Sequence, residues 1–171
     1  MRHPPRKGFA ATALVALVAL AAAPAGAAPP VMSVSANIAK PLTLSWVQNL
    51  DLGTIVLGPG TWSNATVAIS RAGVFSCANA NVTCTGAAMV AKYNVSGTNN
   101  QTVRISTPNV TLTNVGDPTR TLTLVVDGPG SLVLTNSGQP GTDFPLGGSI
   151  VLSSSTVGGT YSGTFNVTVD Y

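Results

Sequence analysis

Apolar residues recur at every second position in many short stretches of this chain, and this period is what most constrains its fold. Val103 and Ile105 alternate with polar neighbours, and so do Val67 and Ile69. Successive side chains of a β-strand point to opposite faces, so the alternation predicts strands with one buried face. The stretches with this pattern are 32–38, 42–46, 65–69, 89–95, 103–105, 110–112, 122–126, 132–134 and 165–171. No stretch beyond residue 27 has a convincing helical period.

Turn-forming residues separate these stretches. The separators combine glycine with proline, aspartate, asparagine or serine, which favour reversals of the chain. They are Gly58-Pro59-Gly60, Ser96-Gly97, Gly116-Asp117-Pro118, Asp127-Gly128-Pro129-Gly130, Gly138-Gln139-Pro140-Gly141 and Gly158-Gly159. Short strands at this spacing predict an all-β fold, a single immunoglobulin-like or pilin-like antiparallel β-sandwich. A membrane barrel is the less favoured alternative, because aromatic residues, which form girdles on such barrels, make up 5% of the chain.

The first 27 residues have the three parts of a signal peptide. Arg2, Arg6 and Lys7 form a positive start, residues 9–23 are apolar, and Ala25-Gly26-Ala27 has the small residues of a cleavage site. We therefore expect a signal peptide over 1–27 and one β-sandwich domain over 28–171. An uncleaved anchor is less favoured, because prolines interrupt the sequence where a longer span would continue. The predicted destination is the periplasm, the cell surface or the medium.

Charge argues against several classes of partner. The chain has eight lysines and arginines, and three of them lie in the predicted signal peptide. The other five balance the five aspartates, so the exported part has no net charge and no basic cluster. We expect it to bind neither nucleic acid nor anionic lipid. No second apolar run follows, so no transmembrane segment is expected in the exported part.

Cys77 and Cys84 are the two cysteines of the chain. Six residues separate them, which suits two strand ends joined by a polar turn. In an oxidising compartment a disulfide is the expected state. A redox pair or a metal site is less favoured, because the spacing is not C-x-x-C and further ligands are scarce.

The inventory of catalytic residues predicts that the protein is not an enzyme and holds no cofactor or metal. His3 is the sole histidine and lies in the predicted signal peptide, and the chain has no glutamate. Triads that need histidine are therefore excluded from the exported part. Asp117 and Asp127 flank one stretch, but each adjoins glycine or proline and is expected to shape a turn.

Three segments resemble a bacterial family of unknown function. These are the segment Leu50-Asp51-Leu52-Gly53-Thr54-Ile55-Val56, the turn Arg71-Ala72-Gly73, and the stretch from Leu146-Gly147-Gly148 to the G-x-Y-x-G-x-F-x-V-x-V-x-Y pattern of residues 159–171. They are similar to the family called domain of unknown function 4402, across nearly all of the exported part. Leu52 departs from the family, which usually has phenylalanine there. The resemblance implies export and a β-sandwich, with no assigned activity.

A looser similarity links the chain to fimbrial pilins and spore-coat-like secreted proteins. Pilins end in an alternating strand with a tyrosine near its end and a glycine upstream, and the matching residues are Gly158, Phe165, Val167, Val169 and Tyr171. An incomplete sandwich of this kind accepts a strand from a neighbour. The residues with the form of such a donor are Met32, Val34, Ala36 and Ile38. The slightly favoured alternative makes them the first strand of their own sandwich.

These observations lead to two functional hypotheses. The first is an exported structural or adhesive surface protein, a fimbrial-type subunit that assembles by strand addition. Its expected partners are copies of itself or pilus-like subunits, and a periplasmic chaperone. The second is a self-contained binding module for a carbohydrate or a protein. Trp62 follows a Gly-Pro-Gly turn and is the aromatic residue expected to be exposed, whereas Trp46 and Tyr93 are in phase with apolar neighbours and are expected in the core.

Overall fold

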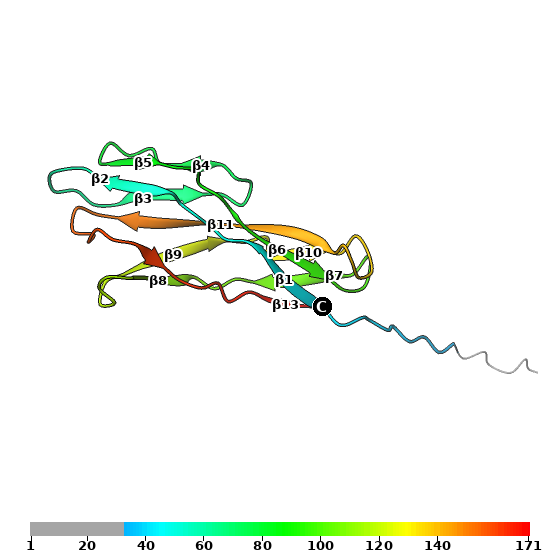
Figure 1. Ribbon diagram of the computed structural model, residues 1–171. Coiled ribbons are helices and arrows are strands. Elements are labelled where there is room, and N and C mark those ends of the chain that lie inside the picture. The colour runs from blue at the N-terminus through cyan, green and yellow to red at the C-terminus, as the bar shows by residue number, and fades with distance from the viewer. Residues whose placement is uncertain (1–32) are drawn as a thin grey trace, which may run out of the picture. The chain divides into compact units, whose positions relative to one another are not determined.

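The computed structural model describes residues 33–171, which form β-strands and no helix (Figure 1). Every pairing between these strands is antiparallel, and the all-β prediction is confirmed. The signal peptide predicted over 1–27 and Met32 lie outside the described residues. The strands are β1 (Thr43–Gln48), β2 (Thr54–Leu57), β3 (Ala65–Ile69), β4 (Phe75–Ser76), β5 (Val82–Thr85), β6 (Ala91–Ser96), β7 (Thr102–Ser106), β8 (Val110–Asn114), β9 (Thr121–Asp127), β10 (Ser131–Val133), β11 (Thr142–Leu152), β12 (Tyr161–Ser162) and β13 (Thr168–Asp170).

The strands form three sheets that pack as a sandwich (Figure 1). The largest sheet has the order β1-β6-β11-β9-β8-β12, and β3, with β4 beside it, also pairs with β11. The first half of β11 pairs with β6, and its second half pairs with β3 and β9. The order β10-β7-β13 makes the second sheet, and β2-β5 makes the third.

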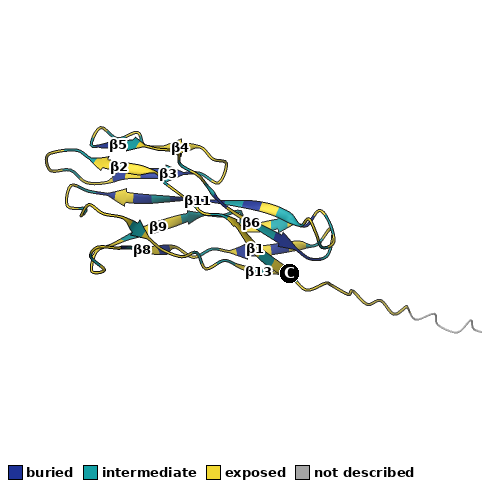
Figure 2. Ribbon diagram, viewed as in Figure 1, coloured by how far each residue is buried: buried dark blue, intermediate teal, exposed yellow. Residues whose placement is uncertain are grey.

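The core consists of two hydrophobic clusters, each built from the alternating residues of several strands. Val67 and Ile150 belong to the first cluster, and Val95 and Phe144 belong to the second. Phe165 packs against both clusters. Figure 2 shows buried and exposed positions alternating along strands such as β3 and β7, as a two-residue period requires.

Strand β11 is the longest of the described strands and was not predicted. It contains Pro145, Gly147 and Gly148, which usually interrupt strands. A Cβ atom at Gly147 would lie 2.3 Å from the backbone oxygen of Ile69 and 2.5 Å from the amide nitrogen of Arg71. The glycine is therefore needed for the close approach of the turn after β3. The sequence period also missed the short strands β2, β4, β5 and β12.

The prediction that residues 32–38 form a half-buried strand of their own sheet is wrong for the part that the structure describes. Residues 33–41 are exposed and form no strand, and β1 begins at Thr43. Val34 is 96% exposed and Ile38 is 86% exposed. Within the described residues, the apolar side chains of this segment are therefore not buried against any sheet.

Candidate functional site

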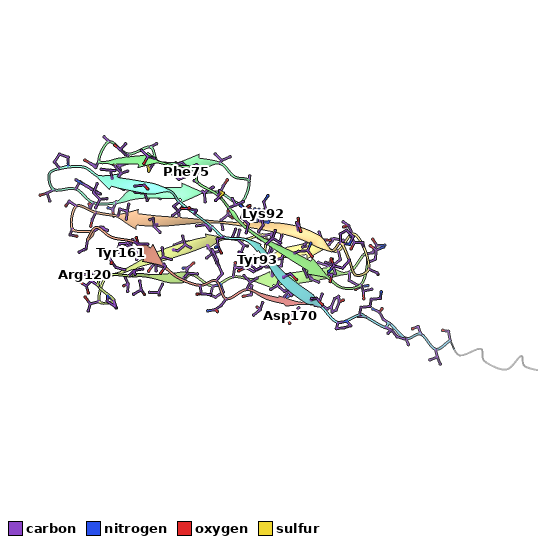
Figure 3. All side chains as sticks on the ribbon, in the orientation of Figure 1. Phe75, Lys92, Tyr93, Arg120, Tyr161 and Asp170 are labelled. Carbon is purple, nitrogen blue, oxygen red and sulfur yellow. A yellow bond between two sulfur atoms is a disulfide. The ribbon has the colours of Figure 1, made fainter. Side chains whose placement is uncertain are left out.

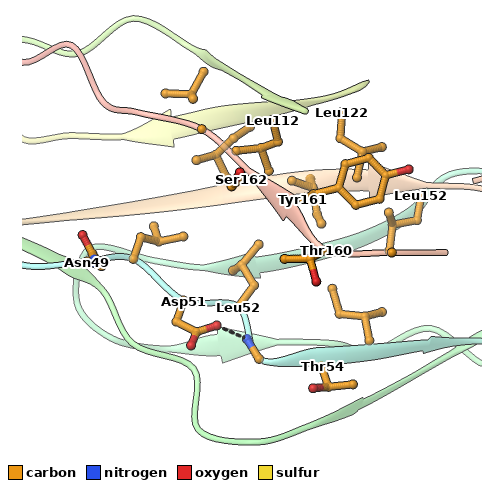
Figure 4. A pocket seen from close by; sticks show the side chains of 18 of the residues that line it. Asn49, Asp51, Leu52, Thr54, Leu112, Leu122, Leu152, Thr160, Tyr161 and Ser162 are labelled. Atoms are coloured by element: carbon orange, nitrogen blue, oxygen red, sulfur yellow. Dashed lines mark hydrogen bonds between the residues drawn. The ribbon is translucent and has the colours of Figure 1, made fainter. Parts of the chain in front are cut away.

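An apolar groove with a volume of about 890 Å³ opens between the segments 49–57 and 156–165 (Figure 4). Side chains from β8, β9 and β11 form its floor. The floor residues are Val110, Leu112, Leu122, Leu124, Ile150 and Leu152. Leu52 and Thr160 lie on facing sides of the opening in Figure 4. Leu112 and Leu122 are partly exposed on this floor, whereas Val110, Leu124, Ile150 and Leu152 are buried, so the groove lies directly over the first core cluster between two stretches of extended chain.

The first side of the groove is the free edge of β2. This strand pairs with β5 alone among the described residues, with Ile55 opposite Cys84 and Leu57 opposite Val82. Just beyond the strand, the amide of Gly58 donates to the carbonyl oxygen of Asn81 at 2.7 Å. Hydrogen-bonded and non-hydrogen-bonded pairs alternate in an antiparallel ladder. The backbone groups of Ile55 and Leu57 therefore point away from β5, and their side chains line the groove.

The second side of the groove, at β12, also has backbone groups that point away from its partner strand. Tyr161 stands opposite Asn114 of β8, and the neighbouring amide of Val115 donates to the carbonyl oxygen of Thr160 at 2.8 Å. By the same alternation, the backbone groups of Tyr161 point away from β8. Among the described residues, backbone donors and acceptors on both sides of the apolar floor are therefore unpaired and available to an added strand.

Asn114 is a buried polar residue that holds this second side in place. Its Nδ2 donates to the carbonyl oxygen of Gly158 at 3.2 Å, and its Oδ1 accepts from the amides of Gly116 and Asp117 at 2.9 and 3.2 Å. The side chain is only 3% exposed, so these bonds satisfy groups that water does not reach. Segment 158–161 is thereby tied to the end of β8.

The groove has almost no charge. Asp51 is its single ionisable acid, and the Asp51 carboxylate accepts a hydrogen bond from the amide of Gly53 at 2.8 Å. Two tyrosines also line it, Tyr93 on β6 and Tyr161 on β12, both labelled in Figure 3. Burial raises the pKa of the Tyr93 phenol above its ordinary value, so this side chain stays neutral at physiological pH. The groove suits an uncharged ligand that presents both polar and apolar groups.

The residues predicted from the resemblance to pilins fall in two places. Gly158 and Phe165 line the groove. Val167 and Val169 instead pack against the second core cluster, where β13 pairs with β7. Tyr171 lies at the same end of the domain and bonds to Thr98. Period analysis missed β2 and Tyr161 as groove residues, although both stretches belong to the segments that carried the family resemblance.

Both predictions about tryptophan exposure are wrong. Trp62 is partly buried against the first core cluster, and its indole Nε1 donates to the carbonyl oxygen of Gly58 at 3.1 Å. Trp46, which was expected in the core, is 62% exposed at one end of the groove, and its Nε1 donates to Oδ1 of Asn49 at 3.1 Å. Trp46 lies on β1, which pairs only with β6 among the described strands, and the large sheet ends there.

The predicted disulfide between Cys77 and Cys84 is present. Its Cα atoms are 6.3 Å apart, and it joins the end of β4 to β5. Both cysteines pack against the first core cluster. Because β5 is the partner of β2, the bond ties one side of the groove to the β3–β4 pair.

We expect the double substitution Cys77→Ala/Cys84→Ala to lower the free energy of unfolding by about 2–3 kcal/mol, because the unfolded chain loses a covalent constraint. Urea titration of the oxidised protein and the variant would measure this. Reduced wild-type protein should unfold at the same urea concentration as the variant. Equal stability of the variant and the oxidised protein would contradict a stabilising role for the bond.

The carboxylates of Asp117 and Asp127 accept hydrogen bonds that stabilise turns. The amide and hydroxyl of Thr119 donate to the Asp117 carboxylate at 3.1 and 2.6 Å, and these bonds hold the pKa of Asp117 below its ordinary value. The Asp127 carboxylate accepts from the amide of Arg71 at 2.8 Å. Within residues 33–171, no group of three or more His, Cys, Asp or Glu side chains is placed to hold a metal ion. The same residues contain no helix long and apolar enough to cross a membrane.

Comparison with known proteins agrees with the resemblance noted from the sequence. No curated protein and no solved structure matches the chain. Residues 42–171 match the family described as Domain of unknown function (DUF4402), and this stretch includes every strand that the structure describes and the whole groove. The chain therefore belongs to the DUF4402 family.

Proposed function

We propose that this protein is an exported structural or adhesive subunit that assembles by accepting an extended strand into its groove. The observation that carries the proposal is an apolar floor flanked by two strand edges that have no partner among residues 33–171, at Ile55 and Leu57 on β2 and at Tyr161 on β12. A strand placed there would bond to backbone groups at its edges and bury alternate side chains against the floor. Such recognition depends on backbone hydrogen bonds and apolar contacts and needs no charged residues, and Asp51 is the only Asp, Glu, Lys or Arg residue that lines the groove.

Export supports this proposal from the sequence. The first 27 residues have the composition of a signal peptide. The Cys77–Cys84 disulfide is of a kind that persists in oxidising compartments. Partners in assembly would be copies of this chain or other pilus-like subunits. A periplasmic chaperone would cover the groove until assembly, because unpaired strand edges over apolar surface invite aggregation.

The proposal gives the protein no catalytic role. The only histidine of the chain is His3, and glutamate is absent. The one acid at the groove, Asp51, accepts a hydrogen bond from its neighbour Gly53. A mechanism of general acid–base catalysis would need a second group there with a matched pKa.

A peptide tests strand addition directly. We would use a short peptide in which valine alternates with threonine, with a lysine at each end, and follow amide exchange by mass spectrometry or NMR. We expect the peptide to slow exchange at the amides of Ile55, Leu57 and Tyr161, because these amides face the groove side of their strands. Amides of β7, which is paired on both sides, should not change.

A groove-blocking variant provides the control. Thr160 is exposed and faces Leu52 across the opening (Figure 4), so Thr160→Trp should fill the entrance and abolish protection by the peptide. Thr123→Trp adds the same side chain at an exposed position of β9 outside the groove and should leave protection unchanged. Absence of peptide protection in the wild-type protein would overturn strand addition as the function.

The exposed Trp46 favours a second candidate, a self-contained carbohydrate-binding module. An exposed indole beside an amide side chain, here Asn49, is a common platform for a sugar ring. Tryptophan fluorescence during titration with a mixed oligosaccharide panel would test this. A quench that Trp46→Ala removes, without any effect of the valine–threonine peptide, would favour the binding module over the assembling subunit.

A further inference from the structure

A second cavity, which we call the Arg120 cavity, has a volume of about 370 Å³ and lies next to the groove. It forms where two neighbouring strands diverge. Within the described residues, β9 pairs with β11 through residues 125–127 only, whereas residues 121–124 of β9 pair with β8. The walls of the cavity come from the segments 119–122 and 151–157 and from Tyr161. Arg120 and Tyr161 are labelled at this end of the domain in Figure 3.

Hydroxyl groups dominate the lining of the Arg120 cavity. Thr119 and Thr121 supply them from the start of β9 and the turn before it, and Ser153, Ser155 and Thr156 supply them from the loop after β11. The amide of Ser153 donates to Oγ1 of Thr156 at 3.0 Å, and the hydroxyls of Ser153 and Ser155 share a hydrogen bond at 2.8 Å, so this loop is ordered by its own bonds. Hydroxyl groups both donate and accept hydrogen bonds. The lining therefore suits a ligand that itself carries several hydroxyl groups.

Arg120 carries the only charge in this lining. Its Nε lies 3.5 Å from Oδ2 of Asp117, and both side chains are about half exposed. The Asp117 carboxylate also accepts two shorter bonds from Thr119, at 2.6 and 3.1 Å. Because the contact with Asp117 uses Nε, the two terminal nitrogens of the guanidinium are available to another acceptor. A guanidinium can bind a carboxylate through two parallel hydrogen bonds.

The size and the remaining walls of the cavity favour a sugar acid over an inorganic anion. A volume of about 370 Å³ falls in the range of small-molecule sites, about 300–1,000 Å³. Leu122, Val151 and Val157 add apolar surface that the C–H groups of a sugar ring can contact. Tyr161 separates the cavity from the groove, and its hydroxyl donates to the carbonyl oxygen of Val157 at 2.8 Å. Phosphate or sulfate would leave the apolar surface without a partner.

We propose that the Arg120 cavity binds a carboxylate-bearing sugar, with Arg120 on the carboxylate and the hydroxyls of Thr121, Ser153 and Ser155 on the hydroxyls of the ring. The uronic acid units of an acidic polysaccharide have this chemistry. The proposal does not depend on strand addition, because Arg120, Ser153 and Ser155 do not line the groove. Trp46 is not in this lining either. A subunit with this site would attach to an acidic polysaccharide while its groove holds a strand.

Titration of the exported protein with galacturonate, trigalacturonate and galactose, followed by NMR amide shifts, tests the site. We expect both acids to shift the amides of Thr121, Ser153 and Ser155. Galactose should bind about tenfold more weakly or less, because it has no carboxylate to pair with Arg120. Tighter binding of trigalacturonate than of galacturonate would identify a polysaccharide as the source of the ligand, and equal binding would identify a free sugar acid. Absence of these shifts with both acids would overturn the proposal.

Two variants on opposite walls locate the ligand. Arg120→Gln should weaken galacturonate binding roughly tenfold to a hundredfold, the range for a hydrogen bond to a charged group. Ser155→Ala, at an exposed position, should weaken it about twofold to tenfold. The matched control is Arg104→Gln, because Arg104 is exposed on β7 outside the cavity and its loss should leave binding unchanged.

Equal binding of galacturonate by the wild-type protein and by Arg120→Gln would contradict the assignment of the carboxylate. Inorganic phosphate that binds as tightly as galacturonate would reduce the site to attraction between charges and would also overturn the proposal. The valine–threonine peptide reports separately on Ile55 and Leu57 of the groove. Loss of peptide protection together with intact galacturonate binding would therefore count against strand addition alone.

Discussion

Substitution of Gly147 by alanine is expected to destabilise the protein by about 3 kcal/mol or more, at the upper end of overpacking effects. The added methyl group would lie 2.3–2.5 Å from backbone atoms of Ile69, Ser70 and Arg71. Backbone cannot rotate aside as a flexible side chain does. The turn after β3 would therefore have to separate from β11, and urea denaturation would measure the loss.

Gly158→Ala is the matched control for this prediction. Gly158 has no heavy atom within 4 Å of the position where a Cβ would stand, so alanine should change stability by only a few tenths of a kcal/mol. Comparable losses in both variants would indicate a general effect of glycine replacement. In that case close packing at Gly147 would not be the cause.

Phe144→Ala should lower the free energy of unfolding by about 3–5 kcal/mol, the range for large-to-small changes at buried aromatic residues. Phe144 is 1% exposed, and its ring stacks on Tyr93 with the centroids 5.8 Å apart. The substitution would leave a cavity in the second core cluster and remove support from a groove residue. Thermal and urea unfolding, followed by circular dichroism, would measure the change.

Phe75→Ala is the control for the loss of an aromatic ring. Phe75 lies on the short strand β4, is 36% exposed and is labelled in Figure 3. Its removal should cost well under half as much as removal of Phe144, because little cavity forms at a surface site. Equal losses at the two positions would contradict the assignment of Phe144 to the core.

Alternation of apolar residues predicted the class of the fold, because the apolar residues of a β-strand with one buried face recur at every second position. Val103 and Ile105 of β7 and Val67 of β3 are buried as their period requires. The disulfide could be predicted because two cysteines in a short polar loop have few other partners. These properties are local, and a single sequence contains them.

Strand β11 could not be predicted in this way, because some of its residues are required by close contacts with neighbouring segments and do not follow the strand period. Gly147 is required by the backbone of the turn after β3, and Gly148 would place a Cβ 2.8 Å from Leu124. Burial alternates over most of β11, with Phe144 and Ile150 buried and Asp143 and Val151 exposed, but its proline and two glycines break the apolar period in the sequence. The low strand propensity of proline and glycine therefore argues against a strand at a position where the sheet has one.

The groove could not be predicted from the sequence either, because its position depends on which strand edges have no partner strand. Whether Ile55 and Tyr161 have free backbone groups depends on the partners of β2 and β12, which are set by contacts between distant residues. Trp46 shows the same limit. Its phase on β1 matches that of Leu42 and Leu44, yet the large sheet ends at β1 and leaves the indole in solvent.

The packing of Phe165 against both core clusters sets an order of folding events in any chain that is delivered from its amino end. A chain that crosses a membrane from its amino end delivers residues 161–171 after β1 to β11. Until then neither cluster has its last aromatic side chain, β7 lacks its partner β13, and the carbonyl oxygen of Lys40 lacks its hydrogen bond from the Tyr171 hydroxyl. In a chain delivered in this order, folding is therefore completed only after Phe165 and Tyr171 have emerged.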